Sequence, residues 1–140
     1  TRMALDVAEL KADEILQILN VLRTSGSYDY IILDLDFFME NSFLTVLQEC
    51  NSIVFVADGS PVSNVKLERA IESLRILEQQ SDRKLLMRSG ILYNRFSSQT
   101  SRKAEVEGLR EYGGIGRFEG FDVWKLLQQL KTQSVFDGME

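Results

Sequence analysis

The chain has 140 residues, of which 44% are hydrophobic and 26% charged, and its formal net charge is -5. This length and apolar content suffice for one domain with its own core, and the acidic balance disfavours binding to a nucleic acid backbone. Histidine is absent, which removes the commonest acid–base catalyst and transition-metal ligand, and the single cysteine, Cys50, excludes an internal disulfide.

The first predicted element is a helix over residues 5–23. Apolar residues recur there at spacings of three and four, with acidic residues early and Arg23 late, as a helix dipole favours. A Ser-Gly-Ser break follows. The apolar run after it predicts a strand over residues 28–34 that is buried on both faces. A short helix is expected next, with Ser42 as its N-cap and its end at residue 49 or 50.

The middle of the chain predicts two further strands and a long helix. The apolar run Ile53–Ala57 is the second strand, and an Asp-Gly-Ser-Pro turn follows it. Ser63 is expected to cap a helix that runs to about residue 80 and carries one apolar stripe. Residues 90–93 are the third strand, and residues 97–101 form a polar loop.

The last third of the chain predicts a helix over residues 102–112 and a glycine-rich passage in which Ile115 forms a short strand. A final helix covers residues 122–131. Strands that alternate with long helices imply right-handed parallel crossovers, so the expected fold is an α/β three-layer sandwich with a mainly parallel sheet. Because few strands are visible, residues 1–140 are either a single domain or the C-terminal half of a larger one.

Polar side chains stand at the carboxyl ends of the predicted strands, where open α/β sheets place their ligands. Asp34 ends the first strand and is the foremost candidate, although a strand-end carboxylate can also cap a helix or pair with a cation. Asp58 follows the second strand and suits a solvated turn. Asn94 follows the third strand, and it fits a ligand contact and a turn equally well.

The order of these segments resembles the MinD, ParA and CpaE family of deviant P-loop ATPases, over nearly the whole chain but only for the family's second half. In that family, a strand much like YDYIILD ends in the Asp of the Walker B and switch II position, which here is Asp34. Residues 52–77 resemble the strand and long helix that follow. Asn94 and Arg95 match the Asn-Arg pair that ends the next family strand. The pattern is most similar to that of the CpaE-like pilus assembly ATPases.

This resemblance implies a P-loop NTPase-like fold with ATP or ADP and Mg²⁺ as cofactors. Asp34 would be the catalytic and metal-related residue, which orients a water on Mg²⁺. Asn94 would hydrogen-bond the adenine edge, the adjacent Arg95 would contact the nucleotide, and Arg117 and Phe118 would line the base pocket. For Arg117, an ordinary surface arginine is the alternative.

The resemblance also implies a biological role. The chain would be part of a homodimeric ATPase that acts as an assembly or localisation switch on a pilus or signalling partner protein. We expect it in the cytoplasm, peripheral at the inner membrane through partners and without direct insertion, because no run approaches the roughly 20 apolar residues of a spanning helix. The final helix is expected to dock on the sheet, since its two lysines attract anionic lipid only weakly.

The chain departs from the family in two places. It contains no G-x-x-x-x-G-K-[ST] loop, and residues 36–38 read Asp-Phe-Phe where the family has a proline and a glycine. The chain alone is therefore not expected to hydrolyse ATP. Either an upstream P-loop half of the same protein supplies the phosphate-binding loop, or the chain is a degenerate, non-catalytic interaction domain.

A receiver domain of a response regulator is a further alternative, because YDYIILDLDFFM also resembles the strand that presents a phosphoacceptor aspartate, again Asp34. A receiver requires two strands and an acidic pair before that strand, and only 33 residues precede Asp34. It also requires a hydroxyl residue at the end of the next strand, where Ala57 stands. Both points disfavour this interpretation.

Overall fold

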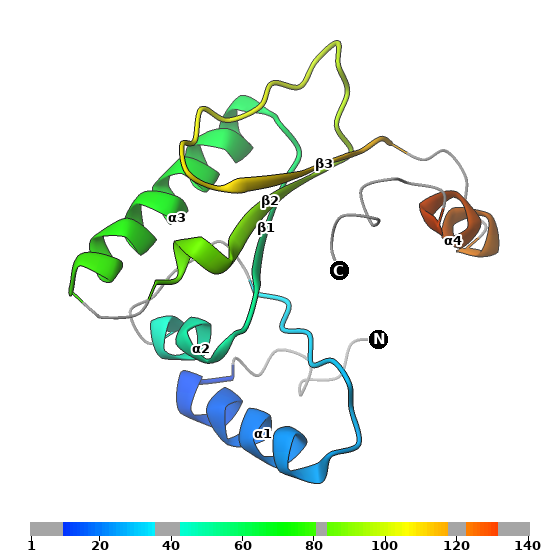
Figure 1. Ribbon diagram of the computed structural model, residues 1–140. Coiled ribbons are helices and arrows are strands. Elements are labelled where there is room, and N and C mark those ends of the chain that lie inside the picture. The colour runs from blue at the N-terminus through cyan, green and yellow to red at the C-terminus, as the bar shows by residue number, and fades with distance from the viewer. Residues whose placement is uncertain (1–9, 36–42, 81–83, 118–122, 132–140) are drawn as a thin grey trace. The chain divides into compact units, whose positions relative to one another are not determined.

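The computed structural model describes residues 10–35, 43–80, 84–117 and 123–131 (Figure 1). The chain divides into two compact units, Thr1–Cys50 and Asn51–Glu140. The first unit contains helices α1 (Ala12–Ser25) and α2 (Phe43–Glu49). Residue 5, the predicted start of the first helix, lies outside the described residues, but residues 10 and 11 are described and are not helical, so α1 begins at Ala12 and the predicted helix was too long at this end. The short helix predicted next is confirmed as α2, and its predicted cap, Ser42, lies outside the described residues.

Helix α1 begins and ends as its sequence directs. The Lys11 backbone N–H donates to the Glu14 carboxylate at 2.8 Å, which satisfies a group that the first turn leaves unpaired. At the other end, Gly26 takes the left-handed conformation with φ of 61°, which glycine adopts without strain. A core cluster packs α1 on α2 through the buried side chains of Ala12, Ile15, Leu19 and Val46.

The strand predicted over residues 28–34 is not formed, since these residues have no regular secondary structure and pair with no strand among the described residues. Alternate side chains, including Ile31 and Leu33, are partly buried against the core cluster of the first unit. Their neighbours Tyr30 and Ile32 are 86% and 88% exposed. The expectation of burial on both faces was wrong, because an apolar run indicates an extended conformation but does not supply a neighbouring strand.

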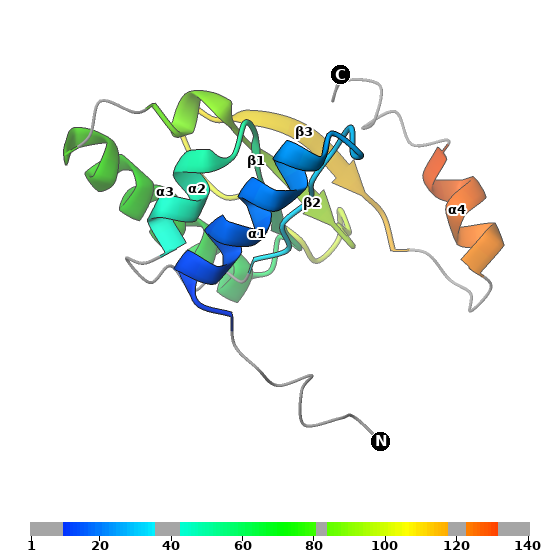
Figure 2. The same ribbon diagram turned by 90° about the horizontal axis from the view of Figure 1, so that it is seen from below.

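The second unit contains a parallel sheet of three strands, in the order β1 (Ile53–Ala57), β2 (Ser89–Asn94) and β3 (Arg110–Ile115). Figures 1 and 2 both show the three strands side by side. Ala57 lies opposite Tyr93, and the next position on β2, Asn94, lies opposite Ile115 on β3. The chain is therefore an α/β protein, and the predicted strands over residues 53–57 and 90–93 are confirmed.

One face of this sheet is covered by α3 (Pro61–Gln80), which packs against β1 (Figure 1). The buried stripe of α3 consists of Leu67, Ala70, Ile71 and Leu74. In β1 the burial alternates, so that Phe55 is buried while Val54 and Val56 on the opposite face are 41% and 45% exposed. The described residues of this unit thus form a helix layer on a sheet, and the second helical layer of the predicted sandwich is not seen among them.

The capping of α3 differs from the prediction. The Ser63 N–H donates to the Ser60 hydroxyl at 3.3 Å, so Ser60 is the N-cap and Ser63 lies inside the first turn. Pro61 opens the helix, at the position where its missing N–H costs no hydrogen bond. The expected cap at Ser63 was wrong because the proline fixes the helix start three residues earlier.

The helix predicted over residues 102–112 is absent. After a short 3-10 helix η2 (Leu86–Arg88) and strand β2, the chain runs irregularly from residue 101 to residue 109 and then enters β3. Gly108 has φ of 83°, which ends any helical path, and pairing with β2 outweighs the helix preference of the charged residues before it. The short strand predicted around Ile115 is confirmed and is longer than expected.

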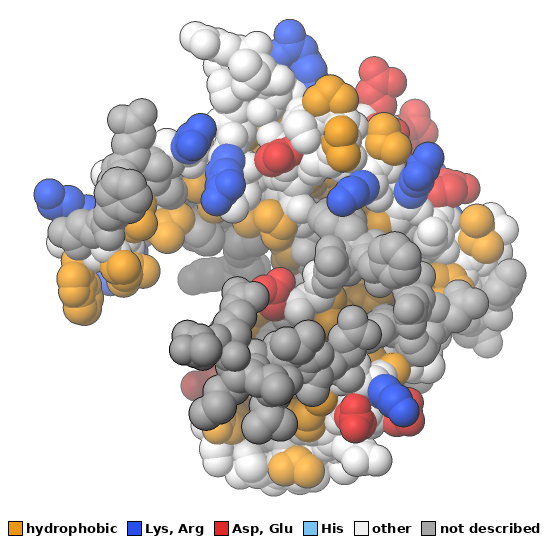
Figure 3. Space-filling model, turned by 180° about the vertical axis from the view of Figure 1, so that it is seen from behind, with side chains coloured by type: hydrophobic (Ala, Val, Ile, Leu, Met, Phe, Trp, Pro, Cys, Tyr) orange, Lys and Arg blue, Asp and Glu red, His pale blue; other side chains and the backbone are white. Residues whose placement is uncertain are grey.

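The last described element is α4 (Val123–Lys131). None of its side chains is buried, and Trp124 is 77% exposed, so the predicted docking of this helix on the sheet is not observed. Hydrophobic side chains gather on α4 in Figure 3, in agreement with the exposed Val123, Trp124 and Leu127. None of the helices in the described ranges combines the length and apolar character that crossing a membrane requires.

Candidate functional site

The carboxyl edge of the sheet in the second unit gathers most of the polar residues singled out in the sequence. Since all three strands are parallel, the segments that leave their carboxyl ends emerge at one edge. Asp58 leaves β1, Asn94 is the last residue of β2, and Gly116 follows β3. Loops at this edge of an open α/β sheet are where ligands bind.

The turn after β1 is held by its own side chains. The Ser60 N–H donates to the Asp58 carboxylate at 2.8 Å, and the Asp58 N–H donates to the Ser63 hydroxyl at 3.2 Å. Hydrogen bonds from the Ser60 backbone and then its side chain, with a smaller one from Ser63, hold the pKa of Asp58 below its ordinary value. Asp58 is exposed and serves the turn, as the sequence predicted.

A set of hydrogen bonds joins this turn to the loop after β2, and we call it the clasp. The Ser101 hydroxyl donates to the Asp58 carbonyl at 2.9 Å and accepts from the Ser97 N–H at 3.1 Å. The Arg102 N–H donates to the Gly59 carbonyl at 2.9 Å. The remaining bond of the clasp runs from the Asn64 side-chain amide to the Arg102 carbonyl, also at 2.9 Å. Ser101 is buried, so the clasp closes the space between the ends of β1 and β2.

Gly59 is required by the clasp. Its φ is 76°, and a Cβ placed on it would lie 2.8 Å from the Ser101 Cβ and 2.9 Å from the Arg102 carbonyl oxygen. Real Cβ atoms do not approach other atoms so closely, so any larger residue would force the loop away from the turn. The turn and the loop therefore depend on the absence of a side chain at this position.

The backbone turns sharply at Arg95, directly after β2. Arg95 has φ of 59°, in a region that residues with a Cβ enter only at a cost, and its side chain is exposed. This turn allows the Phe96 N–H to donate to the Ile115 carbonyl at 3.1 Å. It also sets the Phe96 ring edge-on to the Tyr93 ring, with centroids 5.3 Å apart. These contacts fix the direction in which the chain leaves β2.

The structure therefore places three of the predicted site residues at one edge of the sheet. Asn94, Arg95 and Arg117 are exposed at the ends of β2 and β3. Asp34 is an exposed residue of the first unit, in the irregular segment after α1. Phe118 lies outside the described residues.

Sequence reasoning missed Ser101 and Arg102 as residues of this edge. Both were assigned to the boundary between a polar loop and a helix that does not form. The local signal for the clasp is Gly59, two residues after the strand that ends at Ala57. A glycine in such a turn indicates a close approach of another part of the backbone. That signal identifies the position but not the residues that approach it.

The acidic residues of the described ranges do not form a metal cage. No group of three or more His, Cys, Asp or Glu side chains in these ranges could hold a metal ion. Mg²⁺ does not require such a cage, because it is commonly bound through one or two carboxylates, waters and the phosphates of a ligand. The exposed carboxylate of Asp34 fits that kind of contact, whereas the Asp58 carboxylate accepts the Ser60 N–H.

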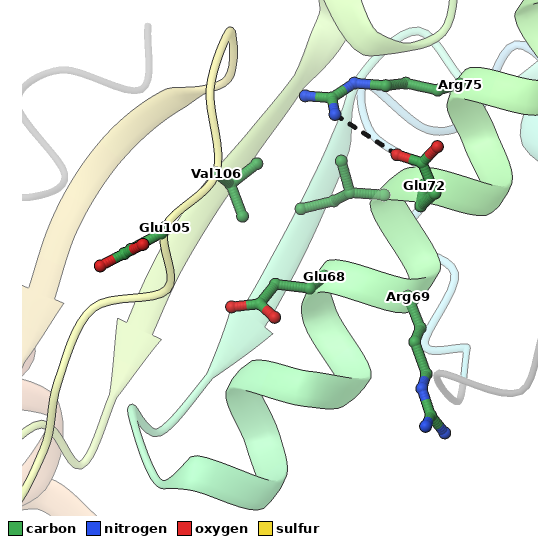
Figure 4. A pocket seen from close by; sticks show the side chains of 7 residues that line it. Glu68, Arg69, Glu72, Arg75, Glu105 and Val106 are labelled. Carbon is green, nitrogen blue, oxygen red and sulfur yellow. Dashed lines mark hydrogen bonds and ion pairs between the residues drawn. The ribbon is translucent and has the colours of Figure 1, made fainter.

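A separate, shallow groove of about 370 Å³ lies between α3 and the irregular chain before β3 (Figure 4). The wall formed by α3 carries both charges, with Glu68, Glu72, Arg69 and Arg75, and the wall formed by the irregular chain carries Glu105. The Arg75 guanidinium donates to the Glu107 carbonyl at 2.8 Å and pairs with Glu72 at 3.4 Å. These contacts tether the chain to α3, which explains the groove as a packing feature.

Comparison with known proteins adds no relative. No protein-family model matches the chain, and no curated protein sequence matches it. A function is therefore inferred from the residues at the carboxyl edge of the sheet and from the order of the sequence motifs.

Proposed function

We propose that this chain is the nucleotide-binding part of an ATP- and Mg²⁺-binding protein of the MinD and CpaE type. That protein acts as an assembly or localisation switch. The observation that supports the proposal is the gathering of Asn94, Arg95 and Arg117 at the carboxyl edge of a parallel sheet. This edge is where open α/β sheets bind nucleotides. The order of motifs along the chain supports the same conclusion.

Each residue has a role that its chemistry suits. The Asn94 amide both donates and accepts hydrogen bonds, as the edge of adenine requires. The guanidinium groups of Arg95 and Arg117 can stack on the base or pair with phosphate. Asp34 would hold a water on Mg²⁺, and Phe118 would line the base pocket with Arg117. A glycine–lysine loop does not occur in the sequence, so we propose that an upstream half of the same protein supplies it and that the chain alone does not hydrolyse ATP.

Calorimetric titration of the chain with ATP and ADP in the presence of Mg²⁺ tests this proposal. Asn94→Ala should weaken ATP binding about tenfold, which corresponds to about 1.4 kcal/mol for one hydrogen-bonding side chain. The matched control is Asn51→Ala, an exposed asparagine before β1 and therefore at the opposite edge of the sheet. Absence of ATP binding by the unsubstituted chain, or equal affinities for the two variants, would overturn the adenine assignment.

A second candidate function is a non-catalytic interaction domain. It is favoured by the exposed face of the sheet, on which Val54 and Val56 lie, because apolar side chains gathered on one exposed face mark association sites. In that case the chain would self-associate or bind its partner without nucleotide. Light scattering of the chain and of a Val54→Lys variant, with and without ATP, distinguishes nucleotide-dependent from nucleotide-independent association.

A further inference from the structure

Every strand of the sheet has an arginine at its carboxyl end. Arg95 directly follows β2, and Arg117 lies two residues beyond β3. Arg102 is distant from β1 in sequence, but the bond from its N–H to the Gly59 carbonyl at 2.9 Å brings it to the end of that strand. All three residues are exposed, and we call them the arginine edge.

The arginine edge is a local excess of positive charge on a chain whose net charge is -5. Lys103 is neutralised by its ion pair with Glu111 at 2.5 Å, whereas neither Arg95 nor Arg117 forms an ion pair with a described residue. Asp58 is the carboxylate of the neighbouring turn, and it accepts the Ser60 N–H. The three guanidinium groups therefore outnumber the described acid beside them.

The backbone fixes the positions of two of these arginines, Arg95 and Arg102, before any ligand binds. Arg95 sits at a left-handed position, with Phe96 fixed to β3 by the bond to the Ile115 carbonyl. Arg102 is held on both sides by the clasp, through its N–H and its carbonyl. A non-glycine residue kept at positive φ indicates a position where function, and not local preference, selects the side chain. Groups arranged in advance also lose less entropy on binding.

We propose that the arginine edge binds the polyphosphate of the nucleotide, so that these residues contact phosphate directly, in addition to the glycine–lysine loop that the proposed upstream half supplies. Guanidinium groups are planar forks that pair with phosphate oxygens through two parallel hydrogen bonds. Neighbouring strands lie about 4.8 Å apart, so three successive strand ends present a row of cations suited to linked phosphates. That the ligand is a nucleotide rests on the proposed function. The contacts themselves require only a ligand with linked phosphate groups.

Titration of the chain with inorganic pyrophosphate isolates this site from adenine recognition. Arg95→Gln and Arg117→Gln should each weaken pyrophosphate binding about tenfold, and the triple variant with Arg102→Gln should abolish it. The control is Arg69→Gln, an exposed arginine on α3 that lines the shallow groove, which should leave the affinity unchanged. Binding should weaken as salt concentration rises, because exposed charges are screened.

Circular dichroism of each variant separates loss of binding from loss of folding. If Arg102→Gln disrupts the clasp, the variants at the exposed Arg95 and Arg117 still test whether the arginine edge binds pyrophosphate. Arg95→Lys should retain part of the affinity, since lysine keeps the charge but not the fork. Pyrophosphate binding that survives in folded Arg95→Gln and Arg117→Gln variants, or no pyrophosphate binding at all, overturns the inference.

The same titrations keep the two proposals apart. If ATP binding requires Asn94 but none of the three arginines, the inference of an arginine edge fails and the adenine assignment stands. If pyrophosphate binding requires the arginines, while ATP binds no more tightly than pyrophosphate and is indifferent to Asn94→Ala, the arginine edge stands and the adenine assignment fails.

Discussion

Substitution of Gly59 by alanine should disrupt the carboxyl edge more than its small size suggests. Two costs add. The left-handed backbone at φ of 76° costs a residue with a Cβ about 1–2 kcal/mol. The new Cβ would also lie 2.8 Å from the Ser101 Cβ and 2.9 Å from the Arg102 carbonyl oxygen, so the loop must move. Movement of the loop weakens the hydrogen bonds of the clasp, each of which contributes about 1 kcal/mol. We expect a total loss of about 2–4 kcal/mol.

Urea unfolding monitored by circular dichroism measures this loss as a lowered midpoint. Gly108→Ala is the matched control in the same unit, because Gly108 also has positive φ, 83°, but a Cβ there would meet nothing within 4 Å. The control therefore incurs the backbone cost alone, and the difference between the two variants isolates the contact with the loop. Equal losses for Gly59→Ala and Gly108→Ala would show that the clasp contributes nothing, and the reasoning would be refuted.

Three further predictions concern the same edge. Ser101→Ala should cost about 1–3 kcal/mol in urea unfolding, because it removes both hydrogen bonds of a buried hydroxyl; Ser98→Ala in the exposed turn is the control and should be neutral. The pKa of Asp58 is lowered from 3.8, so its stabilisation is complete above that value and is lost as pH falls through the folded-state pKa; Asp58→Asn should flatten this acid limb, and an unchanged limb would contradict the assignment. Arg95→Gly should stabilise the chain by about 0.5–1 kcal/mol while it weakens pyrophosphate binding, because it relieves positive φ and removes a guanidinium group; a lower urea midpoint would argue against stored strain.

The elements that the sequence predicted correctly are those that local pattern determines. The apolar run Ile53–Ala57 and the long stripe of α3 each carry their own signal, so both were located within three residues. The parallel order of β1 and β2 followed from the helix between them. The cap of α3 was misplaced only because Pro61 fixes the helix start more firmly than Ser63 does.

The larger errors, a strand and a helix that do not form, concern contacts between residues distant in sequence. Residues 28–34 have a strand-like composition, but the sequence does not state which strand would pair with them, and no described strand does. Residues 102–112 have a helix-like composition, but pairing of β3 with β2 and the positive φ of Gly108 decide their conformation. Of the residues at the carboxyl edge of the sheet, Asn94 and Arg95 were singled out because they follow a predicted strand. Arg102 was missed because only its hydrogen bond to Gly59 places it there.

The clasp also limits where a ligand can lie on the carboxyl edge. Ser101 is buried between the turn after β1 and the loop after β2, so the protein itself occupies the space between those two strand ends. The ends of β2 and β3 carry no comparable bridge in the described residues beyond the single bond from the Phe96 N–H to the Ile115 carbonyl. A ligand at this edge is therefore expected against Asn94 and Arg117, with Arg102 reaching it from the side of β1. Because Asp58 lies on the closed side, its substitution should change stability at low pH but not the affinity for pyrophosphate.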